Sequence, residues 1–275
     1  MVSIINNQGI MSHSKTSYLE VASKLLSRTN PNDEEALPYE IRLEQEDQPF
    51  FPYSPSVSYR FTNVSMYSSG NVEQSLFTAD LLSSYFEPSE LPSITVTDGT
   101  SCIGGNTWAF ASTFGSVNAV ELNFLHLSFL QHNLSEMGMY NVNYYHDNYI
   151  SQIGKLRQQV LFLDPPWGGI QYRKHPEVGL RSPSGIFYSV PQLLYTIPST
   201  GSYSPQVICI KLPRNYQTQG LRKLHYPFKK IIILKTKEGA VLYKLLLFSK
   251  HQTRRCVSIP TFAPIRYKKI HYTRV

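Results

Sequence analysis

From Val57 onward, short apolar runs alternate with segments of helical periodicity, and this alternation limits most strongly what the chain can fold into. Strand-like runs occur at Ile94–Val96, Val117–Glu121, Val142–His146, Val160–Leu163 and Val207–Leu212. Between and around them, helices are expected over 77–86, 107–114, 123–137, 149–158 and 188–197. Strands that alternate with helices predict a doubly wound, Rossmann-like α/β fold with a mostly parallel sheet.

The end of this region predicts an antiparallel addition to the sheet. Lys230–Lys235 and Val241–Phe248 are apolar runs separated by the turn signal Lys237-Glu238-Gly239. Two such runs joined by a short Gly-bearing turn are typical of a β-hairpin. We therefore expect seven strands, of which the C-terminal hairpin forms an antiparallel edge.

Three segments are predicted along the chain. Residues 1–56 combine a helix over Ser14–Arg28 with an acidic, Pro-rich arm. Residues 57–250 form the α/β domain, and residues 251–275 form a basic tail.

Positive charge is concentrated in the last quarter of the chain. Residues 206–275 hold sixteen Lys and Arg and a single acid, Glu238, whereas the chain before them is acidic on balance. Such asymmetry indicates a polyanionic partner, and charge alone does not separate RNA from DNA or an anionic membrane.

Other whole-chain features exclude several protein classes. No run of eighteen apolar residues occurs, so no membrane span is expected. The first eleven residues are too polar for a signal peptide, and three dispersed cysteines fit a reducing compartment. We expect an intracellular protein, nuclear or cytoplasmic, that is not secreted. No His or Cys spacing indicates a metal site.

The first candidate site is the loop that follows the strand at Ile94–Val96. It reads Asp98-Gly99-Thr100-Ser101-Cys102-Ile103-Gly104-Gly105-Asn106-Thr107 and opens the next helix. Ligands of open α/β sheets bind at the carboxyl ends of the strands, and glycines let the backbone approach them closely. An acid at the head of the loop suits a ligand that carries an ammonium group. The expected cofactor contacts here are Asp98, Gly99, Thr100, Gly104, Asn106 and Thr107.

Acidic and amide side chains also end the next two strands. Glu121 follows Asp98 by 23 residues and can accept hydrogen bonds from both hydroxyls of a ribose. Asp147 and Asn148 end the third strand, where a side chain could reach an adenine amino group. We interpret these three residues as further cofactor contacts.

Asp164-Pro165-Pro166-Trp167 directly follows the strand Val160–Leu163 and resembles the signature of amino-methyltransferases. The prolines fix the turn so that backbone carbonyls, with Asp164, can accept hydrogen bonds from an incoming amine. Trp167 would stack on the base. These four residues are the predicted catalytic set, and catalysis would rest on positioning the amine for direct methyl transfer.

Residues around this motif narrow the resemblance. Trp167-Gly168-Gly169 with Tyr172 nearby, and Leu212-Pro213-Arg214-Asn215 after the next strand, are similar to the trimethylguanosine synthase family. The resemblance covers roughly residues 59–249. It implies a class I methyltransferase that uses S-adenosyl-L-methionine to modify the 2-amino group of a 7-methylguanosine cap, with capped RNA as partner. The predicted substrate contacts are Trp167, Tyr172, Arg173, Lys174, Arg214 and Asn215.

Two departures from that family keep alternatives open. The family has Ser before Pro-Pro-Trp, whereas Asp164 is typical of adenine-directed enzymes, so adenine-N6 methylation of RNA or DNA is one alternative. Ser101-Cys102-Ile103 precedes Gly104, so the first glycine of the family's loop is absent. This second departure favours a non-catalytic RNA-binding subunit.

Overall fold

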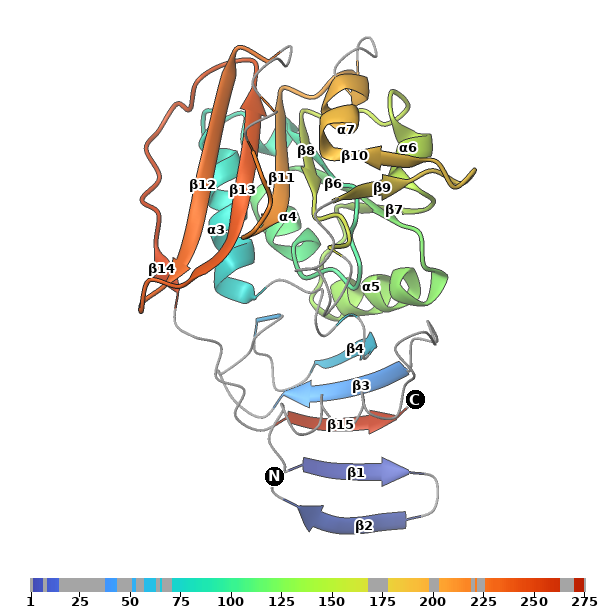
Figure 1. Ribbon diagram of the computed structural model, residues 1–275. Helices are drawn as coiled ribbons and strands as arrows, with labels where there is room; N and C mark the ends of the chain where they lie inside the picture. Colours follow the sequence, from blue (N-terminus) through green and yellow to red (C-terminus); the bar gives the residue numbers. More distant parts are fainter. Residues whose placement is uncertain are drawn as a thin grey trace.

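The large sheet of the protein confirms the predicted fold class. The computed structural model describes residues 2–6, 9–14, 38–43, 51–52, 57–62, 65, 71–167, 178–197, 203–218, 221, 226–262 and 270–274. Within them, eight strands form one sheet in the order β14-β12-β13-β11-β8-β5-β6-β7 (Figure 1). The predicted seven strands are present, and the eighth is the two-residue strand β14 (Thr261–Phe262), which pairs with β12.

Five neighbouring strands of this sheet run parallel. They are β5 (Thr95–Asp98), β6 (Ser116–Glu121), β7 (Val142–His146), β8 (Val160–Leu163) and β11 (Val207–Pro213). The predicted hairpin, β12 (Phe228–Thr236) and β13 (Val241–Ser249), adds antiparallel strands beside β11. All parallel strands therefore end at one edge of the sheet, which is where polar residues can gather.

Apolar residues cover both faces of the sheet. In β8, Val160 and Phe162 belong to one hydrophobic cluster, and Leu161 and Leu163 belong to a second. Successive side chains of a strand point to opposite faces, so a continuous apolar run is what a strand covered on both sides requires.

Helices complete the two layers. The first cluster includes residues of α3 (Val72–Ser83), α4 (Thr107–Thr113) and α5 (Phe124–Glu136). The second includes residues of α6 (Tyr149–Gln152) and α7 (Val190–Thr196). The sheet is thus doubly wound, as the sequence predicted. In the described part of the chain, no helix combines the length and apolar character needed to cross a membrane.

Three predicted helices differ from the observed ones. Helix α3 begins five residues earlier than expected, because Asn71 caps it by accepting a hydrogen bond from the Glu73 N–H (2.8 Å). Helix α6 ends early, and Gly154 beyond it has a positive φ of 78°. The start of the helix expected over 188–197 is instead strand β10 (Phe187–Ser189), which pairs with β9 (Gly179–Arg181).

Two smaller sheets involve the predicted N-terminal arm and C-terminal tail. Strand β3 (Pro38–Leu43) pairs with β4 (Ser58–Thr62) and with β15 (Ile270–Arg274), and β1 (Val2–Asn6) pairs with β2 (Gly9–Ser14). The predicted helix over 14–28 lies outside the described residues except for Ser14, which ends β2. The division of the chain at residues 56 and 250 stays a prediction.

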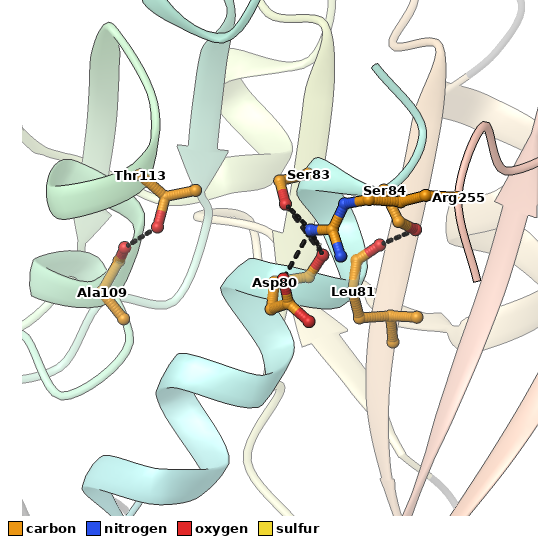
Figure 2. Close-up of polar contacts among 7 residues, drawn as sticks. All are labelled: Asp80, Leu81, Ser83, Ser84, Ala109, Thr113 and Arg255. Carbon is orange, nitrogen blue, oxygen red and sulfur yellow. Dashed lines mark hydrogen bonds and ion pairs between the residues drawn. The ribbon is translucent and has the colours of Figure 1, made fainter. Parts of the chain in front are cut away.

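The segment after β13 is attached to the end of α3 (Figure 2). The Arg255 guanidinium donates to Ser83 Oγ (2.7 Å) and to the Asp80 carbonyl (3.0 Å). The Arg254 N–H donates to the Ser84 carbonyl (2.7 Å). The first residues of the predicted basic tail therefore use part of their hydrogen-bonding capacity within the fold.

Candidate active site

The loop after β5 surrounds a buried carboxylate. Asp98 is 1% exposed and accepts hydrogen bonds from Thr107 Oγ1 (2.8 Å) and from the Thr100 N–H (3.4 Å). Burial raises the pKa of Asp98 to about 7, although both hydrogen bonds favour the ionised form. A ligand that brings positive charge to this carboxylate would reverse that shift.

Cys102 takes the place of the glycine that is absent from the loop. It has φ 49°, the left-handed conformation that glycine adopts most easily, and Gly104 has φ 101°. The turn closes through hydrogen bonds from Ser101 Oγ to the Asp98 carbonyl (2.8 Å) and from the Gly104 N–H to the Ser101 carbonyl (2.9 Å). The loop thus keeps a left-handed turn without the glycine.

Other predicted contacts in this loop also have structural roles. A Cβ on Gly99 would lie 2.5 Å from Leu163 Cδ2, so tight packing explains the glycine. Asn106 Oδ1 accepts a hydrogen bond from Ser75 Oγ (3.0 Å), which links the loop to α3. Thr107 begins α4 and holds Asp98, as described above.

Glu121 at the end of β6 is anchored to the same loop. Its Oε2 accepts from the Cys102 N–H (2.8 Å), and its Oε1 accepts from the Asn123 N–H (2.7 Å). Burial raises the pKa of Glu121, and these N–H donors oppose the rise. Each carboxylate oxygen has two lone-pair sites, so both can accept a further hydrogen bond from a ligand hydroxyl.

Asp147 and Asn148 at the end of β7 lie next to Glu121. The Asp147 N–H donates to the Glu121 carbonyl (3.2 Å), and the Asp147 carboxylate accepts from the side chain of Gln152. Asn148 caps α6 by accepting from the Ile150 N–H (3.0 Å), and its amide donates to the Arg181 carbonyl. The Asp147 carboxylate also accepts from the Asn148 N–H (2.7 Å), so both residues have structural contacts, and Asp147 is the more exposed of the two.

Thr100 joins the loop to the Asp164-Pro165-Pro166-Trp167 segment. Its Oγ1 accepts a hydrogen bond from the Asp164 N–H (2.7 Å), while its own N–H points to Asp98. The ends of β5 and β8 are thereby held together. The predicted cofactor loop and the predicted catalytic segment therefore lie side by side at this edge of the sheet.

The Asp164 carboxylate has a cationic partner that the sequence-based site did not include. Lys211 Nζ lies 2.6 Å from Asp164 Oδ2, and both side chains are largely buried. Leu163 of β8 pairs with Ile210 of β11, so the next residues of the two strands, Asp164 and Lys211, come side by side. A lysine inside the apolar run Val207–Leu212 was the available signal, because a buried lysine almost always has a partner.

Trp167 lies at the boundary of the two hydrophobic clusters and is partly buried against each. Lys211 Nζ lies 5.5 Å from the centroid of the Trp167 ring and 5.0 Å from that of Tyr243. These distances allow cation–π attraction to both rings. Pro165 is buried and Pro166 is exposed, so the segment turns outward between them.

The predicted substrate contacts are only partly described. Tyr172, Arg173 and Lys174 lie outside the described residues. Arg214 and Asn215 follow β11 directly and are exposed. Among the described residues, no group of three or more His, Cys, Asp or Glu could hold a metal ion.

The sequence is similar to those of a known protein family and of a curated viral protein. The sequence model of the family described as "RNA cap guanine-N2 methyltransferase" matches residues 94–251. The curated relative "Uncharacterized protein L320" of Acanthamoeba polyphaga mimivirus is 33% identical over 126 residues, which are 45% of this chain and 47% of that protein. The matched region thus spans about half the length of that relative.

Solved structures with a similar shape include several methyltransferases. A putative methyltransferase from Porphyromonas gingivalis W83 is 16% identical, with 70% of this chain and 45% of that chain covered and a TM-score of 0.48. A 16S rRNA N2 methyltransferase from T. Thermophilus, in complex with AdoMet and guanosine, is 16% identical, with 71% and 48% covered and a TM-score of 0.47. Likenesses of this size carry no argument about function. The family match covers more than half of the chain, and the protein therefore belongs to the RNA cap guanine-N2 methyltransferase family.

Proposed function

We propose that the protein transfers a methyl group from S-adenosyl-L-methionine to the 2-amino group of a 7-methylguanosine cap on RNA. The observation that carries the proposal is the joined site at the ends of β5 and β8. There Thr100 ties the Asp98 loop to Asp164-Pro165-Pro166-Trp167, within the region that matches the family.

The carboxylates at the strand ends fit S-adenosyl-L-methionine, the cofactor of this family. Asp98 is buried and Glu121 is half-buried, and among the described residues no Lys or Arg forms an ion pair with either. A cofactor with an ammonium and a sulfonium group supplies the missing positive charge and an electrophilic methyl group. Glu121 has acceptor sites for ribose hydroxyls, and Asp147 beside it can accept from an adenine amino group.

On the other side of the site, Asp164 can accept the hydrogen bonds of the target amine. Guanine presents its N1–H and its 2-amino group side by side, and a carboxylate can accept from both. Trp167 would stack on the base, and a cationic 7-methylguanine would add about 1–2 kcal/mol of cation–π attraction when desolvated. Holding the amine in line with the methyl group then lowers the barrier by orientation.

Two other functions compete with this one, each on a specific residue. Asp164 in place of serine favours adenine-N6 methylation, because Asp at this position is typical of adenine-directed enzymes. A carboxylate can accept a hydrogen bond from the adenine amine as well as from guanine. Cys102 in place of glycine favours a non-catalytic RNA-binding subunit. The left-handed φ of Cys102 argues against that last function, because the turn keeps the conformation that glycine would give it.

A single assay separates the three functions. The protein is incubated with labelled S-adenosyl-L-methionine and, in parallel, a 7-methylguanosine cap analogue, an unmethylated guanosine cap analogue and an uncapped adenine-containing oligonucleotide. Label on the first substrate supports the proposal, and label on the oligonucleotide alone supports adenine methylation. RNA binding without transfer to any substrate supports the non-catalytic function. Asp164→Ala, which leaves Lys211 unpaired and is therefore first checked for folding by thermal unfolding, is the control, since it should abolish transfer while the cofactor still binds.

A further inference from the structure

Lys211 is a charged residue in the middle of a buried strand. Its neighbours in β11 are fully buried, and Lys211 itself is 8% exposed. An unpaired ammonium at such a position is strongly disfavoured, and its ion pair with Asp164 stabilises it there. The sequence thus places a cation inside the sheet, directly beside the predicted amine acceptor.

The geometry of the pair leaves part of Asp164 for a ligand. Lys211 Nζ contacts Oδ2. Among the described residues no donor contacts Oδ1, so this oxygen can receive a hydrogen bond from a base amine. Attraction to the Trp167 and Tyr243 rings, at 5.5 and 5.0 Å from the ammonium, also helps to hold it in place. Lys211 therefore joins the amine acceptor and the base platform into one arrangement.

Other titratable groups on the neighbouring strands lie near Asp164. In addition to burial, the Asp164 charge raises the pKa of Asp98 on β5, Cys102 in the following loop, Cys209 on β11 and Tyr243 on β13. Glu121 at the end of β6 raises the pKa of Asp98 and Cys102 in the same way. Burial raises the pKa of Asp164, and Lys211 lowers it. Lys211 is thus the cation that opposes protonation of Asp164.

We propose that Lys211 is a positioning residue that keeps Asp164 ionised, with Oδ1 directed at the target amine, at neutral pH. This inference rests on the proposed function in one respect, namely that a base amine approaches Asp164. The ion pair has no net charge, so it offers the amine a strong acceptor without adding net charge to the base pocket.

The test compares Lys211→Met with Lys211→Arg in the full-length protein. Methionine keeps much of the side-chain length but removes the charge, whereas arginine keeps the charge. Lys244→Met is the matched control: Lys244 lies on the adjacent strand β13 and donates to the Tyr216 carbonyl (2.8 Å) rather than to a carboxylate. Thermal unfolding and cofactor affinity, measured by calorimetry, show which variants remain folded.

The first readout is the ionisation of Asp164, which needs no substrate. The ¹³C carboxyl resonance of Asp164, identified by its loss in Asp164→Asn, is titrated in each variant. We expect the midpoint to move up by at least one pH unit in Lys211→Met and to stay in place in Lys211→Arg and Lys244→Met. An unmoved midpoint in Lys211→Met would overturn the inference, whatever the substrate of the enzyme is.

The second readout is the pH dependence of kcat on whichever base the wild type methylates. In Lys211→Met the acid limb should move to higher pH, with kcat at least tenfold below wild type at pH 6.5 and a narrowing difference toward pH 9. A constant loss at every pH would indicate a purely structural lysine and would also overturn the inference. If the wild type methylates adenine instead of the cap, the proposed function fails while the shifted titration and acid limb still support Lys211. When Lys211→Met is combined with Asp164→Asn, it should cause no further shift of the acid limb, because the titrating carboxyl is absent.

Discussion

Asp98 at the end of β5 and Asp164 directly after the adjacent parallel strand β8 are both largely buried, but only Asp164 forms an ion pair. Asp98 is held by a hydroxyl and an N–H group, and among the described residues it has no basic partner. Asp164 has Lys211 at 2.6 Å. Burial raises the pKa of both carboxyls, but only Asp164 has a cation of the fold to oppose the rise.

This difference divides the site into two halves. On the proposed cofactor side, Asp98 and Glu121 leave negative charge for a cationic ligand to neutralise. On the proposed base side, the charge is neutralised within the protein, so base recognition there would depend on hydrogen bonds and on stacking against Trp167. Variants that affect one half and spare the other test the division.

The largest effect is expected from Trp167→Ala. Loss of stacking removes about 1–3 kcal/mol of base binding, and a loosely held base no longer presents its amine in line. Methyl transfer to the cap analogue should fall by roughly a hundredfold or more, and cofactor affinity measured by calorimetry should stay nearly unchanged. Trp167→Phe should retain partial activity, because the smaller ring still stacks.

Two results would contradict this expectation for Trp167. Unfolding of Trp167→Ala would show that the ring serves the two hydrophobic clusters rather than a base. Equal binding of the 7-methylguanosine and unmethylated guanosine caps by the wild type would remove the main support for the cap substrate, and adenine methylation would then be favoured.

On the cofactor side, Glu121→Ala should weaken S-adenosyl-L-methionine binding at least tenfold. Two hydrogen bonds from ribose hydroxyls to a charged group contribute roughly 1.5–3 kcal/mol each. The variant also removes the acceptor of the Cys102 N–H, so Glu121→Gln, which keeps one carbonyl oxygen, should lose less. Unchanged affinity in calorimetry of Glu121→Ala would exclude this residue from the cofactor site.

The pKa of Asp98 predicts how cofactor binding depends on pH. With a pKa of about 7, the Asp98 carboxyl of the cofactor-free protein is mostly protonated at pH 6 and mostly ionised at pH 8. A cationic ligand favours the ionised form, so affinity for S-adenosyl-L-methionine should rise about tenfold across this range. Asp98→Asn should bind weakly at all pH values, with a flat profile. A wild-type affinity that is independent of pH would contradict the cationic contact.

Stability of the free protein should show the opposite trend. The pKa of Asp98 is higher in the folded state than in the unfolded chain, so the folded state binds the proton more tightly. The stabilisation is therefore complete below the ordinary pKa of 3.8 and is lost progressively as the pH rises from there through about 7. Chemical denaturation of wild type and Asp98→Asn at pH 5.5 and 8 should show a drop in the wild type that the variant lacks.

The smallest effects are expected from the basic residues outside the site. Lys235 and Lys237 are exposed at the end of β12, whereas Arg255 is bound to Asp80 and Ser83. Lys235→Gln and Lys237→Gln should each weaken RNA binding a few-fold and reduce the log–log salt slope by about 0.7. Arg255→Gln should mainly lower the melting temperature. If the RNA affinity of the wild type is the same at low and physiological salt, the positive charge of these residues does not bind RNA phosphates.

Local sequence patterns were enough to predict most of the fold. Alternating strands and helices predicted the doubly wound sheet, and Lys237-Glu238-Gly239 predicted the C-terminal hairpin. Positions after strands β5, β6, β7 and β8 supplied the candidate site, because parallel strands end at the same edge of the sheet. The family also followed from the sequence, since Asp164-Pro165-Pro166-Trp167 with the two glycines after it, and Leu212-Pro213-Arg214-Asn215, can be seen without tertiary information.

Pairings between distant segments required the tertiary structure. Strand β10 was predicted as the start of a helix, because nothing local shows that 187–189 pairs with 179–181. Arg254 and Arg255 read as a free basic tail, although the fold attaches them to α3 more than 160 residues earlier in the chain.

The amino-acid sequence by itself determined the α/β fold, the family and the acids that end the strands, since these depend on local periodicity and short motifs. Only the tertiary structure showed that Asp164 forms an ion pair with a lysine, Lys211, whereas Asp98 has no such partner among the described residues. Asp164 and Lys211 are 47 residues apart, and they meet because β8 and β11 are neighbours with Leu163 opposite Ile210. Burial makes that ion pair stabilising, because either charge left alone at this position would be desolvated without a partner.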